Sequence, residues 1–122
     1  MTELKILDLS ELPITDLSVL RSRKLELLRI GSTKVRDLTP LAGLPLRVLH
    51  SDNNEVTDVR PLTQCPELRW IVLPNSVNNV LLLKQLPKLE RISERFGHES
   101  MPVETAKEYW ERYDREHKPP AP

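Results

Sequence analysis

The sequence predicts an α/β solenoid, in which short repeats stack side by side and share one parallel sheet. Two observations support this fold class. Apolar residues recur at the same positions about every 21 residues. In a stretch such as Leu28-Arg29-Ile30, apolar and polar residues also alternate as they do in a β-strand with one buried face. A single repeat of this length cannot bury its own apolar side, so neighbouring repeats must stack.

The period holds column by column. The aligned columns are Leu12, Thr33, Asn54, Asn75; Ile14, Val35, Val56, Val77; Asp16, Asp37, Asp58, Asn79; and Leu20, Leu41, Leu62, Leu83. The strand leucines shift once, because Glu67 is an extra residue and the Pro74-Asn75 turn is one residue shorter. We therefore expect four to five repeats: 4–24, 25–45, 46–67 and 68–88, with a fifth strand around 89–92.

Each strand is expected to turn alternate residues inward. Leu28, Leu49 and Ile71 would stack inside, and their neighbours would face outward on a parallel concave sheet. In the turn after a strand, the amides of Asn54 and Asn75 can bond to backbone groups that the turn leaves unpaired. Leu12 and Thr33 occupy the same column, so this series of amides is incomplete.

The opposite, convex side is expected to hold short 3₁₀ turns. Asp16, Asp37 and Asp58 precede short apolar runs and suit the N-cap of a helical turn. Pro40 and Pro61 lie in the first turn of these segments, where a missing N–H costs little.

The repeat pattern ends after residue 92. Residues 93–100 are polar and indicate a loop, and the segment after Pro102 predicts an amphipathic helix that ends at residue 117. Its apolar face would consist of Val103, Ala106, Trp110 and Tyr113. We expect this helix to cap the last repeat, with Trp110 in the core of the cap. The chain thus divides into repeats at 1–92, a loop and capping helix at 93–117, and a disordered tail at 118–122.

The segment LELLRIGSTKVRDLTPLAGLPL resembles the leucine-rich repeats of bacterial proteins, in particular the short repeats of internalin-like proteins. Its form is L-x-x-L-x-[LI]-x-x-[NT]-x-[VI]-x-D-[LI]-x-P-L. The final segment, LPKLERISERFGHESMPVETAKEYWERYD, is similar to the end of repeat arrays that follow bacterial serine/threonine kinase domains, although the chain has no kinase motif of its own. These resemblances imply a module that binds a protein partner, as part of a larger bacterial signalling protein.

Composition argues against several other functions. Lys plus Arg and Asp plus Glu number 18 each, so no net charge draws the chain to nucleic acid or to an anionic membrane. Cys65 is the only cysteine, the N-terminus lacks the apolar stretch of a signal peptide, and no apolar run is long enough to span a membrane. We therefore expect a cytoplasmic protein.

No arrangement of residues predicts catalysis, a metal or a cofactor. Asp16, Asp37 and Asp58 would form a line of single carboxylates, whereas calcium needs six to eight oxygens around one point. His50, His98 and His117 lack the spacing of zinc ligands, and Cys65 is expected to be a small buried hydrophobe. The sequence therefore predicts a protein that is not an enzyme.

The outward strand positions are the candidates for partner binding. They combine an apolar stripe with charged neighbours, the composition of an interface. The residues are Ile6, Asp8, Leu27, Arg29, Val48, His50, Asp52, Trp70 and Val72. Outward strand positions favour branched and aromatic residues in any case, so a purely structural origin of the stripe is the alternative. Two further hypotheses are a spacer that self-associates through its uncovered N-terminal edge, and an accessory domain of a kinase elsewhere in the chain.

Overall fold

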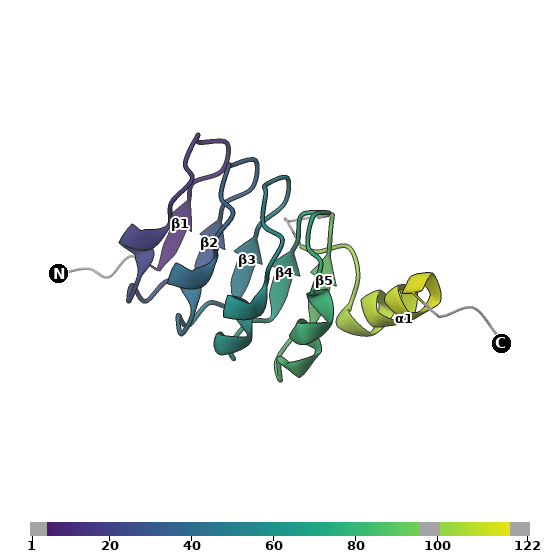
Figure 1. The fold of residues 1–122 in the computed structure, drawn as a ribbon. Helices are drawn as coiled ribbons and strands as arrows, with labels where there is room; N and C mark the ends of the chain where they lie inside the picture. The colour runs from purple at the N-terminus through teal and green to yellow at the C-terminus, as the bar shows by residue number, and fades with distance from the viewer. Residues whose placement is uncertain (1–4, 96–100, 118–122) are drawn as a thin grey trace.

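The structure, a computed structural model, describes residues 5–95 and 101–117. Leu4, residues 96–100 of the expected loop and the expected tail at 118–122 lie outside these residues. Five parallel strands form one sheet in sequence order (Figure 1). The strands are β1 (Ile6–Asp8), β2 (Leu27–Arg29), β3 (Val48–His50), β4 (Trp70–Val72) and β5 (Arg91–Ser93). The chain is a leucine-rich-repeat solenoid, so the predicted fold class is confirmed.

The register of the sheet is the one that the repeat columns predict. Leu28 pairs with Leu49, and Leu49 pairs with Ile71 across the extra residue Glu67. Leu28, Leu49 and Ile71 are all fully buried. Stacking of the same inward position in successive repeats therefore builds a continuous, largely aliphatic core.

The convex side consists of 3₁₀ turns, as expected. They are η1 (Ser18–Leu20), η2 (Thr39–Leu41), η3 (Arg60–Gln64) and η4 (Val80–Gln85). The predicted N-cap role of the three aspartates is wrong by one residue. The N-cap positions are Leu17, Leu38 and Val59, each directly after an aspartate, and they make no side-chain cap. Each aspartate Oδ1 instead accepts a hydrogen bond from a backbone N–H two residues on, at 2.8 Å. The carboxylates therefore still order the entry to each turn.

The backbone groups in the turn after each strand find different hydrogen-bond partners from one repeat to the next. Asn54 Nδ2 donates to the Ile30 carbonyl at 3.3 Å, and Asn54 Oδ1 accepts the Val56 N–H. Thr33 replaces the amide in its repeat, because its hydroxyl donates to the same Ile30 carbonyl at 2.7 Å. Asn75 is exposed, and the hydroxyl of its neighbour Ser76 donates to the previous repeat.

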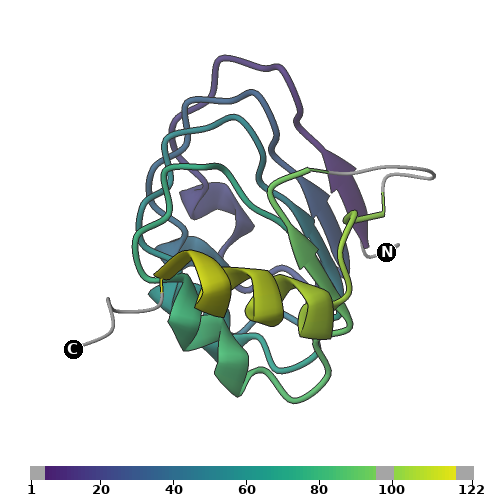
Figure 2. The ribbon, with the colours of Figure 1, turned by 90° about the vertical axis from the view of Figure 1, so that its right-hand side faces the viewer.

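A helix and a short extended segment together cover the C-terminal end of the sheet. Helix α1 spans Ala106–His117, three residues shorter at its start than the predicted segment, and it lies across the end of the coil (Figure 2). Residues 104–106 run antiparallel to β5: Ile92 N–H donates to Glu104 O at 3.1 Å, and Ala106 N–H donates to Glu90 O at 2.8 Å. The backbone edge of β5 is therefore paired. No helix among the described residues is long and apolar enough to cross a membrane.

Tyr109 holds the position that the sequence analysis assigned to Trp110. Tyr109 is 4% exposed and belongs to the core, whereas Trp110 and Tyr113 are half-buried and pack against it. Val103 precedes the helix and is exposed, so its assignment to the apolar face was wrong. Trp110 is more exposed to solvent than Tyr109 and makes a cation–π contact with Lys84, whose ammonium lies 5.4 Å from the ring centroid.

Candidate partner-binding face

An apolar column runs across the concave face of the sheet. The strand register aligns four of the predicted residues in order: Ile6, Leu27, Val48 and Trp70. Ile6 is 64% exposed and the other three are half-buried. The sheet therefore presents contiguous apolar side chains to solvent instead of burying them all in the core.

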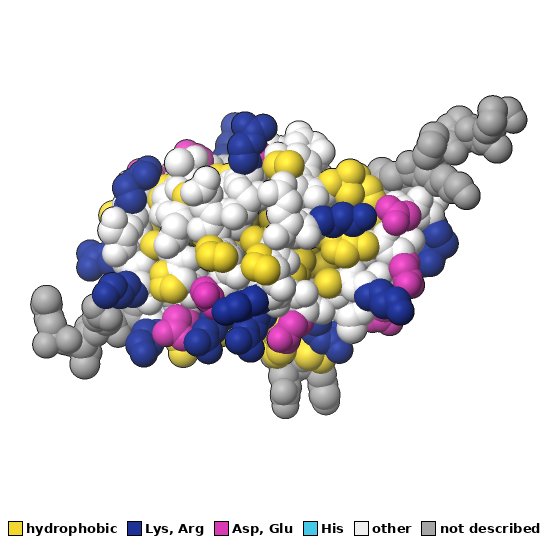
Figure 3. All heavy atoms as spheres, turned by 90° about the horizontal axis from the view of Figure 1, so that it is seen from below, with side chains coloured by type: hydrophobic (Ala, Val, Ile, Leu, Met, Phe, Trp, Pro, Cys, Tyr) yellow, Lys and Arg dark blue, Asp and Glu magenta, His cyan; other side chains and the backbone are white. Residues whose placement is uncertain are grey.

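Charged side chains border this apolar column at the strand starts. Figure 3 views the molecule from below and shows basic and acidic side chains mixed along the lower edge. A carboxylate oxygen of Glu26 lies 3.7 Å from Lys5 Nζ, and the other lies 3.7 Å from Arg47 Nε. Further along, Arg69 Nη1 lies 3.9 Å from Glu90 Oε2. Exposed ion pairs of this kind add little to the stability of the fold. Their position around an apolar centre matches the polar rim of a protein interface.

The second outward column is less accessible than predicted, which corrects the sequence analysis. His50 is 5% exposed and Val72 is 0% exposed, so Val72 cannot contact a partner in this conformation. Val72 is nevertheless absent from the cluster of core residues. The next residue in its column, Ser93, is also buried and donates a hydrogen bond to Glu104 Oε1 at 3.1 Å. Burial thus increases toward the end of the sheet where the C-terminal segment returns.

An open pocket of about 180 Å³ lies at the strand ends and contains three of the predicted residues. Its lining is Ser10, Glu11, Arg29, Gly31, Ser32, His50 and Asp52. Beside the pocket, Asp8 Oδ2 lies 3.9 Å from Arg29 Nη1, and Asp8 Oδ1 accepts the Ser10 N–H at 2.9 Å. The hydrogen bonds from Ser10 and the charge of Arg29 lower the pKa of Asp8. The pocket therefore presents fixed charges of both signs next to the apolar column.

Gly31 is buried in this pocket because a neighbouring side chain occupies the space next to its Cα. A Cβ added to Gly31 would lie 2.6 Å from Asp52 Oδ1, closer than nonbonded atoms approach. Asp52 holds the equivalent position one repeat further along the chain. Its carboxylate fills the space that a side chain at position 31 would need.

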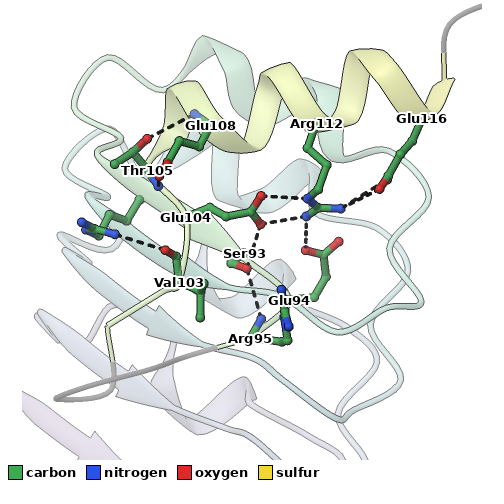
Figure 4. Close-up of polar contacts among 10 residues, drawn as sticks. Ser93, Glu94, Arg95, Val103, Glu104, Thr105, Glu108, Arg112 and Glu116 are labelled. Carbon is green, nitrogen blue, oxygen red and sulfur yellow. Dashed lines mark hydrogen bonds and ion pairs between the residues drawn. The ribbon is translucent and has the colours of Figure 1, made fainter.

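A network of ion pairs joins the cap to the last strand (Figure 4). Arg112 Nε and Nη2 donate to the two carboxylate oxygens of Glu104 at 2.8 and 2.9 Å. Arg112 Nη2 also donates to Glu94 Oε2 at 2.9 Å, and Nη1 donates to Glu116 Oε2 at 3.2 Å. The guanidinium lies 5.0 Å from the ring centroid of Tyr109. Bidentate geometry fixes orientation as well as charge, so the network holds the helix in position over β5.

This network makes the cap sensitive to acid. Hydrogen bonds from Arg112 and Ser93 lower the pKa of Glu104 below its ordinary value of 4.5. Because the pKa of Glu104 is lower in the folded state than in the unfolded state, the ionised carboxylate stabilises the fold above pH ~4.5. This contribution is lost as the pH falls through the folded-state pKa.

We expect the melting temperature of the Glu104→Gln variant to fall less than that of wild type between pH 6 and pH 3, because the variant has no carboxylate to protonate at position 104. The exposed Glu111→Gln variant is the control, and an equal response in both would contradict this role of Glu104.

Two signals in the sequence could have located the cap more accurately. Thr105-Ala-Lys-Glu108 has the form of a capping box, and both of its hydrogen bonds are present: Glu108 N–H to Thr105 Oγ1 at 3.1 Å, and Thr105 N–H to Glu108 Oε1 at 2.9 Å. Arg112 lies four residues after Glu108 and four before Glu116, a spacing that favours an ion pair along the helix. The antiparallel pairing of residues 104–106 with β5 has no such local signal.

The described residues include no group of three or more His, Cys, Asp or Glu side chains arranged to hold a metal ion. Cys65 is fully buried, its thiol donates to the Leu41 carbonyl at 3.1 Å, and burial raises the pKa of the thiol. These surroundings keep the thiol protonated, as expected for a small buried hydrophobe. The side chains of His98 and His117 lie outside the described residues.

Comparison with known proteins finds similar solved structures. One is an internalin, inlF, from Listeria monocytogenes, with a TM-score of 0.61 and 25% identity over 66% of this chain. Another is internalin C2 from the same organism, with a TM-score of 0.53 and 28% identity over 74% of this chain. The chain spans only 25% of the first protein and 51% of the second. No family model and no curated protein matches the sequence.

Proposed function

We propose that this leucine-rich-repeat solenoid is a protein-interaction module that binds its partner on the concave face of the sheet. The observation that carries this proposal is the accessible apolar column from Ile6 to Trp70, which runs across four strands and is bordered by charges. An interface typically has an apolar centre and a polar rim, and contiguous exposed apolar residues with polar neighbours mark interaction sites. The similarity to internalins supports an interaction module in general.

Trp70 and Arg29 are the proposed anchors of this face. Trp70 is the largest residue of the column, and Arg29 lies in the pocket at the strand ends. Tryptophan and arginine are enriched among residues that contribute most to binding. The bacterial signalling context, the kinase association and the cytoplasmic location remain predictions.

The variant Arg29→Ala/Trp70→Ala is expected to weaken partner binding by about 2 kcal/mol or more, because two anchors are removed together. Its stability should stay close to wild type, since neither residue lies in the core. The measurement is affinity capture from a bacterial lysate, followed by titration with the captured protein after purification.

The matched control is Arg36→Ala/Leu81→Ala, which removes an arginine and an apolar residue that are both exposed away from the concave columns. This control should bind like wild type. A folded Arg29→Ala/Trp70→Ala variant that binds its partner as tightly as the control would refute concave-face binding.

A further inference from the structure

The two ends of the solenoid differ in how well they are covered. Of the five exposed large apolar residues in the described part of the chain, three belong to the first repeat: Ile6, Leu12 and Val19, which are 64%, 45% and 73% exposed. The inward residues Leu7 and Leu9 are only half-buried, whereas their equivalents in the second repeat are fully buried. The core therefore ends at an incompletely covered apolar surface next to β1.

The backbone edge of β1 is also open. Lys5 O accepts the Leu27 N–H at 3.0 Å, and Leu9 N–H donates to Arg29 O at 2.8 Å, so the odd-numbered residues bond to β2. Because successive residues of a strand direct their polar groups to opposite edges, those of Ile6 and Asp8 face away from β2. The edge of β5 is paired with residues 104–106, which leaves β1 as the open edge of the sheet among the described residues.

Charges of opposite sign lie at the two ends of β1. Lys5 is at the strand start, and the turn that leads into β2 at the same end carries exposed Arg21 and Arg23. Asp8 and Glu11 are exposed at the strand end. A two-fold axis perpendicular to the sheet would make two β1 strands antiparallel, and the basic end of each copy would then meet the acidic end of the other.

We propose that a second copy of this chain binds at this end, through antiparallel pairing of the two β1 strands. The pairing satisfies the outward backbone groups of Ile6 and Asp8 and covers the half-buried Leu7 and Leu9. It also joins the two sheets, so that their concave faces become continuous. A parallel arrangement would place like charges together, which is why the two-fold arrangement is favoured.

The first test is sedimentation equilibrium of the full chain over a range of protein concentrations. The wild type is expected to form dimers, and Ile6→Glu is expected to raise the dimer dissociation constant roughly tenfold or more, because a negative charge replaces an apolar contact at an edge that meets the acidic end of the other copy. Leu81→Glu is the matched control: Leu81 is exposed in the fourth repeat, and the dimerisation of this variant should equal that of wild type. A wild type that stays monomeric at every concentration, or equal effects of the two substitutions, would overturn the proposal.

A charge exchange tests the orientation of the two copies. Lys5→Glu alone and Glu11→Lys alone each place like charges across the two-fold axis, so each variant should dimerise several-fold more weakly than wild type. An equimolar mixture of the two variants restores both opposite-charge contacts in a mixed dimer, and uniform ¹⁵N labelling of one variant lets native mass spectrometry distinguish this dimer by mass. Failure of the mixture to form mixed dimers in preference to the two homodimers would refute the antiparallel arrangement.

Discussion

Leu49→Ala is expected to lower the free energy of unfolding by about 2–5 kcal/mol. Leu49 is fully buried and stands in the middle strand, where it pairs with Leu28 on one side and Ile71 on the other. Removing its side chain leaves a cavity between stacked repeats, and the flanking strands cannot move inward without breaking the sheet register. A loss of this size is a large part of the stability of a small domain.

Chemical denaturation of Leu49→Ala and Val48→Ala measures this effect. Val48 is the adjacent residue, faces the concave side and is half-buried, so its truncation should cost much less. A denaturation midpoint of Leu49→Ala equal to that of Val48→Ala would be inconsistent with the inward stacking of Leu49.

Deleting residues 101–117 should cause aggregation and remove cooperative unfolding. The deletion unpairs the edge of β5, exposes Ile92 and the last repeat, and removes the ion pairs of Arg112. An open apolar edge pairs readily with other chains, and a terminal repeat needs a covered outer side. Light scattering and thermal melting report the two effects.

Point substitutions separate the contributions within the cap. Tyr109→Ala should cost about 3 kcal/mol or more, because the ring is buried in the core. Trp110→Ala should cost less, since Trp110 is half-buried. A truncated chain that does not aggregate and keeps an unchanged melting temperature would show that residues 101–117 do not cap the solenoid.

The register of the sheet was predictable because the repeat columns align the strands with one another. Each inward position must match the same position one repeat away, and the single extra residue at Glu67 is compensated within the following turn. Alternation then decides which residues face outward, so the alignment of Leu27, Val48 and Trp70 followed from the sequence.

Accessibility was not predictable in the same way. Alternation assigns Val72 and His50 to the concave side, but it does not reveal that both are buried there. The repeat pattern also does not reveal the pairing of residues 104–106 with β5, because this is a backbone contact that leaves no side-chain pattern. In the helix the apolar pattern fitted both Tyr109 and Trp110, and the packing geometry decided between them.

The close approach of Asp52 to Gly31 makes the residue choices in neighbouring repeats depend on one another. A side chain at position 31 requires the carboxylate of Asp52 to turn away or to be replaced, so the two positions are coupled although they lie 21 residues apart. A repeat transplanted into this array would therefore need a residue at each of these positions that is compatible with its neighbour.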